Sequence, residues 1–492
     1  MTPFGDFIYF GLLLYAVLPT VALGLFSRAG RWWLLLVTLA LLAVQYAGDL
    51  AIRPGLEVRE LWIVLGYAVF EGAVAWCFLK RKSRVTFWIT LLLAIAPLAL
   101  AKVLPLLSPE SAFGFLGISY VTFRAIDVVL CIQDGLIKSL SPAQYFAYLL
   151  FFPTISSGPI DRYRRFAQDW VRDRSRAEFL DDLDFAIARI FRGFLYKFII
   201  AALLHAHWVA PLGKQNTFLA KLGLMYADTF YLFFDFAGYS AFAIGLSRLF
   251  GIRTPENFNA PFLSRNIRDF WTRWHITLSF WFRDHVYMRF LLAAAKGKWF
   301  AGKHTANYLG LFLTFGLMGV WHGLELRYIL YGLYHAALLC GYDWFARWNK
   351  ERKVWGDGPR WRASNVLLTF HAFAFGIILF NGRLTPHAPP PNEELVENVD
   401  CREVVGVLWD RAQPDEQREV DIYVDSSWVA RIRCDDVRED LRNRGMGDGR
   451  HGFRFALPSY VRDGHSHTIE VRLAGSNKEL RGSPEVVTCD RE

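Results

Sequence analysis

Two histidines occur where an imidazole could take part in catalysis. His322 follows a long apolar run in LFLTFGLMGVWHGLELRYIL, and His275 lies 47 positions earlier in WTRWHITLSFW. An imidazole that its surroundings keep neutral can accept a proton from a hydroxyl group and so make that hydroxyl a nucleophile. Ionisable residues within membrane segments tend to face a cavity, but histidine also forms hydrogen bonds between packed helices. The residues alone therefore leave both a catalytic and a packing role open.

Five further histidines have only their closeness to apolar runs in common: His205, His207, His285, His335 and His371. We interpret them as packing residues. The HAH sequence at 205–207 has no carboxylate or thiolate nearby, and the tail sequences HSH (465–467) and 435–440 do not match the spacing of zinc or calcium ligands, so no metal site is predicted.

The elements that must position His275 and His322 are membrane helices. Hydrophobic residues make up 53% of the 492 residues and charged residues only 21%, which is typical of a multi-pass membrane protein. Apolar runs that approach the roughly 20 residues needed to cross a bilayer predict about eleven spans. These runs are 8–26, 32–47, 61–79, 85–104, 111–132, 189–210, 217–250, 274–295, 307–322, 326–346 and 364–380.

Two charged aromatic stretches interrupt this pattern, at 143–170 and 253–290. The second contains RNIRDFWTRWHITLSFWFRDHVYMRF (265–290), with five arginines among its aromatic residues. Such segments are too polar to lie freely in lipid and too apolar for open solvent. We expect them to lie at the membrane interface or to re-enter the membrane lined by protein.

The tail differs in composition from the rest of the chain. The sequence LTPHAPPPNEE, which begins at Leu384, cannot continue a helix, so we assign 1–383 to a membrane domain, 384–399 to a linker and 400–492 to a soluble β-rich domain. From residue 384 onward there are 15 basic and 22 acidic residues, against 40 and 24 before it. VDIYVDSSWVARIR (420–433) predicts two strands around a turn, HTIEVRLAG (467–475) predicts a third, and 435–449 predicts a short polar helix.

Cysteines and charge bear on the compartment of the tail. The six cysteines show no paired or metal-type spacing, and the odd set of three in the tail argues against a disulfide there. Basic clusters such as 80–84 are expected on the cytoplasmic face, which places the N-terminus outside. Eleven spans would then leave the tail in the cytoplasm, whereas RWNKERK (347–353) and RWR (360–362) would place it outside; the span count favours the cytoplasm.

Three motifs together resemble the membrane-bound O-acyltransferase superfamily. They are FFPTISSGPIDRYRRF (151–166), NFNAPFLSRNIRDFWTRWHITLSFWFRDHVYMRF (257–290) and MGVWHGLELRYILYGLYHA (318–336). Within the superfamily, the chain is most similar to the branch that moves D-alanine onto lipoteichoic acid. The resemblance covers about residues 1–383 and implies an all-α polytopic fold in the bacterial cytoplasmic membrane, with re-entrant or interfacial helices beside the spans.

The resemblance also implies roles for individual residues. His322 matches the catalytic histidine of the superfamily and His275 the second functional histidine of the branch, so we expect His322 to be the general base and His275 to polarise or position the substrate. Trp271, Trp274, Trp321 and Gly323 are expected to contact the substrate. The chain itself binds no cofactor, because the acyl group arrives as a thioester on the phosphopantetheine arm of a small acidic carrier protein.

An acidic carrier requires a basic docking surface with an apolar centre. The expected docking residues are Arg265, Arg268, Arg273, Arg283, Val286, Met288, Arg289, Leu291 and Leu292. We expect Asp269 and Asp284 to pair with these arginines. We assign Ser157, Gly158, Pro159, Asp161 and Arg162 to the same cytoplasmic mouth. Alternatively, the arginines anchor an interfacial helix to anionic lipid headgroups.

The β-rich tail departs from the branch and leaves the acceptor open, since any envelope polymer or lipid with a hydroxyl group would serve. An O-acetyltransferase of a secreted polysaccharide, of the alginate type, is the alternative within the superfamily. A transporter or lipid flippase would be a different class of protein. Inverted repeats would favour that class, and the sequence shows none. No feature of the sequence indicates binding to nucleic acid.

Overall fold

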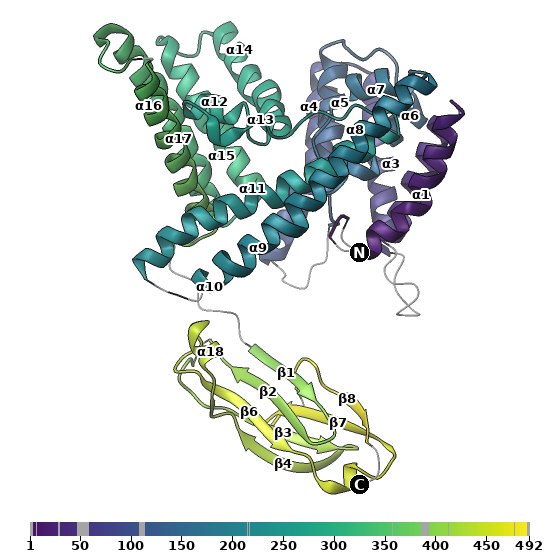
Figure 1. Cartoon of the computed structure of the whole chain (residues 1–492), viewed down its shortest axis with the longest axis vertical. Helices are drawn as coiled ribbons and strands as arrows, with labels where there is room; N and C mark the ends of the chain where they lie inside the picture. The colour runs from purple at the N-terminus through teal and green to yellow at the C-terminus, as the bar shows by residue number, and fades with distance from the viewer. Residues whose placement is uncertain are drawn as a thin grey trace. The chain divides into compact units, whose positions relative to one another are not determined.

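The computed structural model divides the chain into two compact units, Met1–Asn381 and Gly382–Glu492 (Figure 1). The first is almost entirely helical and the second is a small β sandwich, in agreement with the predicted fold class. The described residues are 3–5, 7–27, 30–46, 59–107, 114–213, 215, 217–356, 358–384, 393–411, 413–476 and 478–489. Most of the proline-rich segment predicted as a linker, residues 385–392, lies outside them.

The helical unit begins with helices that follow the predicted apolar runs. They are α1 (Phe7–Leu25), α2 (Arg31–Tyr46), α3 (Arg59–Lys80), α4 (Arg84–Leu107) and α5 (Ile118–Gln133). Short elements follow, namely α6 (Pro142–Leu149), the 3-10 turn η1 (Phe152–Thr154) and α7 (Tyr163–Val171). Next, one helical rod from Arg176 to Gly213 comprises α8 (Arg176–Phe194), η2 (Leu195–Ala201), α9 (Ala202–Leu204), η3 (His205–Val209) and α10 (Ala210–Gly213). Because η2 and η3 are π-helical turns, the face that this rod presents shifts along its length.

The second half of the helical unit carries both candidate histidines. The long helix α11 (Phe218–Leu249) is unbroken and covers nearly all of the predicted run 217–250. After it come η4 (Pro261–Leu263), α12 (Ile267–Trp271), α13 (Ile276–Phe282), η5 (Arg283–Tyr287) and α14 (Met288–Gly297). Three long helices complete the unit: α15 (Lys303–His322), α16 (Leu326–Arg352) and α17 (Pro359–Phe380).

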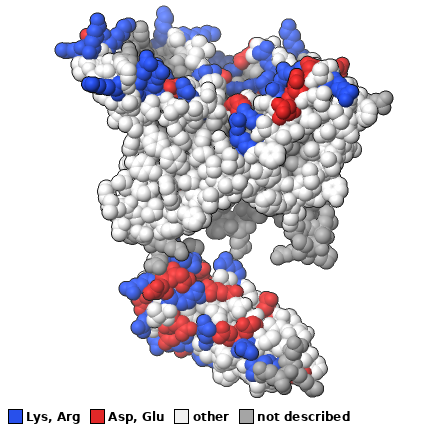
Figure 2. All heavy atoms as spheres, viewed as in Figure 1, with Lys and Arg blue, Asp and Glu red and all other residues white. Residues whose placement is uncertain are grey.

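Five of the described helices are long and apolar enough to cross a bilayer, as expected of a multi-pass protein. They are Phe7–Leu25, Glu60–Lys80, Arg84–Pro105, Phe218–Leu249 and Pro359–Phe380. The total of about eleven spans stays a prediction. On the helical unit, lysines and arginines gather along one edge, and the band beside that edge is almost free of charge (Figure 2). We call this edge the basic face; it includes the α16–α17 connection (Figure 1).

The two charged aromatic stretches are packed inside protein. Tyr145, Tyr148, Phe151 and Phe166 of the first stretch are all at most 2% exposed. The buried Arg124 of α5 holds this stretch by donating hydrogen bonds to the carbonyls of Tyr148 and Leu149, at 3.1 and 3.0 Å. Its charge is thereby spread over backbone oxygens, which is how a guanidinium can be kept within an apolar interior.

Two four-stranded antiparallel sheets form the second unit. One has the order β1-β2-β6-β5 and the other β4-β3-β7-β8 (Figure 1). The strands are β1 (Glu393–Val399), β2 (Glu403–Trp409), β3 (Glu419–Val424), β4 (Ser427–Arg433), β5 (Asp436–Val437), β6 (Arg450–Ala456), β7 (Ser466–Leu473) and β8 (Glu485–Thr488). The predicted turn between β3 and β4 contains Asp425 and Ser426 at positive φ, and the predicted polar helix is α18 (Glu439–Asn443). The core lies between the sheets and includes Val420, Val424, Phe453 and Val471.

Two predictions for the tail are wrong. The first strand begins at Glu393, inside the segment 384–399 that was assigned to a linker, because the run EELVENV pairs with β2. Cys401 and Cys489 form a disulfide across 88 residues, although the odd number of cysteines had argued against one. The third cysteine, Cys434, is simply buried in the core of the sandwich.

Candidate active site

His275 lies at the junction of α12 and α13 and has an unusual backbone conformation. Its φ of 43° is in the left-handed region, which is strained for a residue with a side chain. The segment 257–260 fixes this junction: the amide of Ile276 donates to the Asn257 carbonyl at 3.0 Å, and the Thr277 hydroxyl donates to Asn257 Oδ1 at 2.7 Å. His275 is 6% exposed, and its ring meets the Phe236 ring edge to face at a centroid distance of 4.7 Å.

His322 is the last residue of α15. Its ring lies 4.4 Å from the Trp321 ring and 4.9 Å from the Phe380 ring. Helix α16 packs so closely on α15 that a Cβ atom added to Gly332 would overlap the carbonyl oxygen of Phe315. The C-terminal end of a helix carries partial negative charge, and the His322 ring lies at that end of α15.

Both histidines line one cavity of about 290 Å³, which we call the histidine cavity. Trp271, Trp274 and Trp321 line it as well, so it brings together all of the predicted substrate contacts except Gly323. Gly323 instead lets the Tyr328 ring approach the turn after α15. Three buried nitrogens on this lining have no hydrogen-bond partner among the described residues: His275 Nε2, Trp271 Nε1 and Trp321 Nε1. Buried donors left unpaired are costly and are therefore candidates for binding a substrate.

Four polar residues of the histidine cavity were not predicted as site residues: Tyr120, Asp235, Tyr239 and Tyr331. Asp235 is an acidic residue inside the apolar helix α11 and forms an ion pair with Lys197 of η2. An intramembrane acid is itself a signal of function, so position 235 could have been selected from the sequence. The tyrosines carry no comparable signal, since tyrosine is common throughout this chain.

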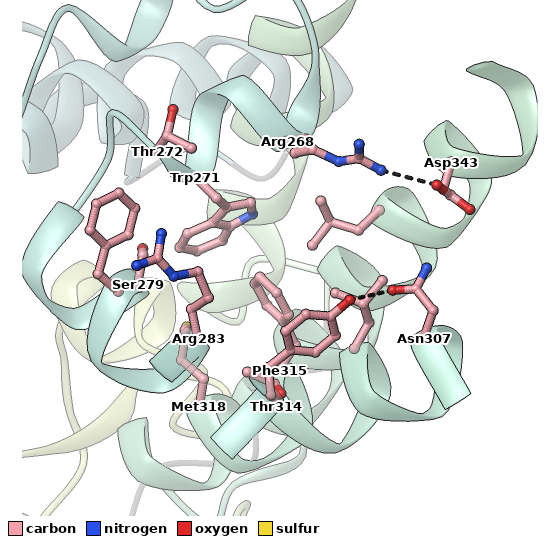
Figure 3. A pocket seen from close by; sticks show the side chains of 14 residues that line it. Arg268, Trp271, Thr272, Ser279, Arg283, Asn307, Thr314, Phe315, Met318 and Asp343 are labelled. Atoms are coloured by element: carbon pink, nitrogen blue, oxygen red, sulfur yellow. Dashed lines mark hydrogen bonds and ion pairs between the residues drawn. The ribbon is translucent and has the colours of Figure 1, made fainter. Parts of the chain in front are cut away.

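A second cavity of about 470 Å³ is lined by side chains of α12, α13, η5, α15 and α16, and we call it the basic-face cavity (Figure 3). Arg268 and Arg283 belong to its lining, and Arg268 pairs with Asp343 of α16 at 3.0 Å. Apolar side chains from α15 and α16 form much of the remaining wall. Trp271 and Met318 line both this cavity and the histidine cavity, so the two hollows meet at the same two side chains.

Of the nine predicted docking residues, only Arg268 and Arg283 line the basic-face cavity. Arg273 pairs with Asp269 and Arg289 with Asp134, while Arg265 is exposed and donates its amide to Asp269. The predicted apolar centre is mixed: Met288 and Leu292 are exposed, whereas Val286 and Leu291 are half-buried. Asp269 and Asp284 both pair with arginines, as expected.

The segment predicted at the cytoplasmic mouth mostly serves to hold the site together. Ser157 lines the histidine cavity, and the amide of Ile160 donates to the Thr277 hydroxyl at 2.9 Å, which fastens this segment to the start of α13. Gly158 and Pro159 are buried, and Asp161 pairs with Arg165. None of these residues is on the lining of the basic-face cavity.

Arg162, the last residue of this segment, belongs to an ionic cluster with residues of α5 and η5. It pairs with Asp127 of α5 at 2.9 Å and with Asp284 of η5 at 3.0 Å. His285, which the sequence had marked as a packing residue, donates to Asp127 Oδ1 at 2.9 Å. The cluster thus joins the motif at 151–166 to the motif at 257–290. It also fixes the position of η5, which carries Arg283.

The family assignment rests on residues 61–383, which match the model of the membrane-bound O-acyltransferase family. A teichoic acid D-alanyltransferase of Bacillus subtilis is 42% identical over 401 residues, covering 79% of this chain and the whole of that protein. A teichoic acid D-alanyltransferase of Streptococcus thermophilus is 35% identical over 78% of this chain and 96% of its own length.

Similarity to acetyl-transferring relatives is more limited. A probable alginate O-acetylase of Pseudomonas syringae is 34% identical over 272 residues, which cover 54% of this chain and 48% of that protein. The family match ends at residue 383, so the β sandwich lies outside it. The helical unit, the paired histidines and these relatives agree: the chain is a multi-pass membrane acyltransferase that belongs to the membrane-bound O-acyltransferase family.

Proposed function

We propose that this enzyme transfers a D-alanyl group from a carrier-protein thioester on the cytoplasmic side to a hydroxyl group of a teichoic-acid-type polymer on the other side. The observation that carries this proposal is the pair of cavities that meet at Trp271 and Met318. One opens beside the arginines of the basic face, and the other holds His275 and His322. The similarity of this chain to teichoic acid D-alanyltransferases supports the choice of acyl group and acceptor.

The basic-face cavity suits the arm of an acyl carrier. Its lining on α15 begins at Asn307, and His322 lies fifteen residues further along the same helix. At a rise of 1.5 Å per residue this is a distance of about 22 Å, comparable with the length of an extended phosphopantetheine arm. Arg268 and Arg283 at the mouth would bind the phosphate of the arm and the acidic surface of the carrier. The apolar wall would hold the rest of the arm.

In the histidine cavity, His322 takes the proton of the acceptor hydroxyl as the oxygen attacks the thioester carbonyl. The carbonyl oxygen gains negative charge, and the unpaired Trp271 and Trp321 N–H groups can donate to it. When the intermediate collapses, the C–S bond breaks, the new C–O bond remains, and the proton held by His322 passes to the departing thiolate. His275 is assigned to positioning the acceptor beside His322.

Reconstitution into liposomes tests this assignment. The purified enzyme receives the carrier loaded with either a D-alanyl or an acetyl thioester, together with lipoteichoic acid, and the mass of the product identifies the group transferred. We expect D-alanyl ester with the wild-type enzyme and none with His322→Ala, while the variant still binds the loaded carrier. Transfer of acetyl alone would assign the enzyme to the alginate O-acetylase type, and full activity of His322→Ala would remove His322 as the base.

A further inference from the structure

The direction of the last three helices fixes the side of the membrane on which the chain leaves the helical unit. Helix α15 starts at the edge of the helical unit that forms the basic face and ends at His322, and α16 returns to that edge (Figure 1). Helix α17 begins beside Trp355, whose ring is 4.4 Å from Trp361, and ends at Phe380, beside the His322 ring. The chain therefore leaves the helical unit at the end remote from the basic face. Positively charged connections lie in the cytoplasm, so this exit is on the opposite side.

The β sandwich contains an independent indication of the same compartment. Its ends are joined by the Cys401–Cys489 disulfide, and disulfides persist in oxidising compartments outside the cytoplasm. Both observations reverse the side that the count of eleven spans had favoured. The compartment outside the cytoplasm is also where the polymers of the cell envelope are found.

One face of the sandwich combines an exposed aromatic ring with fixed hydrogen-bonding groups. On the outward side of β4, β3 and β7, Trp428 lies opposite Tyr423, and Arg431 lies opposite Asp421. The next strand continues both rows, because Glu470 lies opposite Tyr423 and Arg472 opposite Asp421. Trp428 is 59% exposed, and the Arg431 side chain is 48% exposed. We call these residues the tryptophan face.

Hydrogen bonds hold the tryptophan face in place before any ligand arrives. Asp421 accepts two bonds from Arg431 at 2.8 Å and one from the Trp428 indole at 3.3 Å. Arg431 is the main reason why the pKa of Asp421 is lowered to about 2, so this carboxylate stays ionised over the physiological range. Arg472 lies over the Tyr423 ring at 4.7 Å. Side chains fixed in this way lose little entropy on binding.

The chemistry of this face fits a glycan better than a protein. The face of an aromatic ring carries negative charge density that attracts the C–H groups on the apolar side of a sugar ring, and the flanking charged groups can bond its hydroxyls. A stable protein interface needs about 800 Å² per partner with an apolar centre, whereas here ion-paired side chains surround the exposed ring. We propose that the tryptophan face binds the hydroxyl-rich glycan chains of the envelope on the non-cytoplasmic side of the membrane.

A binding assay tests the proposal: the full-length enzyme, in lipid nanodiscs, is exposed to immobilised polymers. The assay contains no acyl donor, so its outcome does not depend on the outcome of the acyl-transfer assay. The probes are soluble peptidoglycan glycan strands, chitooligosaccharides and lipoteichoic acid. We expect at least one of them to be bound, and Trp428→Ala to weaken that binding tenfold or more. Tyr460→Ala is the matched control, because Tyr460 is also an exposed aromatic residue of the sandwich, at 53%, and lies on η6 (Ser459–Val461) away from this face.

Equal binding by Trp428→Ala and the wild type, or no binding to any of the three polymers, overturns the proposal. A thermal unfolding curve for each variant checks that the sandwich is intact. In spheroplasts, a protease added outside should release the β unit, detected with an antibody against it. Cleavage only after the membrane is permeabilised would place the unit in the cytoplasm and equally overturn the proposal.

Discussion

The docking role of the basic-face cavity predicts a loss of affinity for the carrier when both of its arginines are reversed. Arg268 and Arg283 have side chains 61% and 51% exposed. An exposed ion pair contributes about 0.2–1 kcal/mol, and reversal replaces an attraction by a repulsion of similar size. Arg268→Glu/Arg283→Glu together should therefore cost about 1–4 kcal/mol, because each reversal counts about twice one pair. This corresponds to a rise in KM for the carrier of between about fivefold and several hundredfold.

Steady-state kinetics with varied carrier concentration, at low and at high salt, measure this effect. The Debye length falls from about 10 Å at 0.1 M salt to about 3 Å at 1 M, so the difference between variant and wild type should shrink at high salt. Lys350→Glu/Arg360→Glu reverses two basic residues of the same face that do not line the cavity, and this control should leave KM nearly unchanged. An equal rise in the control would show that the arginines act through general surface charge, as in anchoring to lipid headgroups, and an unchanged KM would refute the docking role.

Three further predictions concern the base, the helix packing and the sandwich. In kinetic assays His322→Gln should lower kcat by about 10²–10⁴-fold, the usual share of a general base, with KM for the carrier within about twofold, since His322 does not line the basic-face cavity. Gly332→Ala should cost about 1–3 kcal/mol by overpacking and lower the melting temperature, unlike Gly341→Ala on the same helix, where an added Cβ meets nothing within 4 Å. Hydrogen bonds to Asp425 and Asp463 raise the pKa of His467. The stabilisation that the protonated ring gives is therefore complete below the ordinary pKa of histidine and disappears as the pH rises through the raised pKa. His467→Gln should lower the melting temperature of the sandwich more at pH 5.5 than at pH 9.

The sequence was most informative where residue chemistry and membrane physics act together. His275 and His322 stood out because ionisable residues are rare in apolar runs, and the structure places both on one cavity. Their meeting depends on Asn257 and Thr277, whose hydrogen bonds turn the chain at a left-handed residue. No periodicity in a single sequence signals such a turn. The two histidine motifs could therefore be identified from the sequence, but their arrangement in space could not.

Other features could not be derived because they depend on contacts between distant segments. The pairing of Cys401 with Cys489 follows from strand order in the sandwich, which brings the beginning and end of the unit together. The docking surface stays a prediction, because the charge pattern shows that arginines are present but not which of them already have partners, as Arg273 and Arg289 do. Arg162 was assigned to a mouth for the same reason, although Asp127 and Asp284 hold it within the fold.

The shared lining of the two cavities bears on how the enzyme keeps the bilayer electrically sealed. Trp271 and Met318 place an indole and a thioether where the two hollows meet. Bulky apolar side chains at such a constriction disfavour a continuous file of water, and without that file protons and sodium ions have no conducting path. In the proposed reaction only the acyl group has to pass this point, carried by its arm into the histidine cavity, so an outer polymer is modified from an internal pool without a leak of ions.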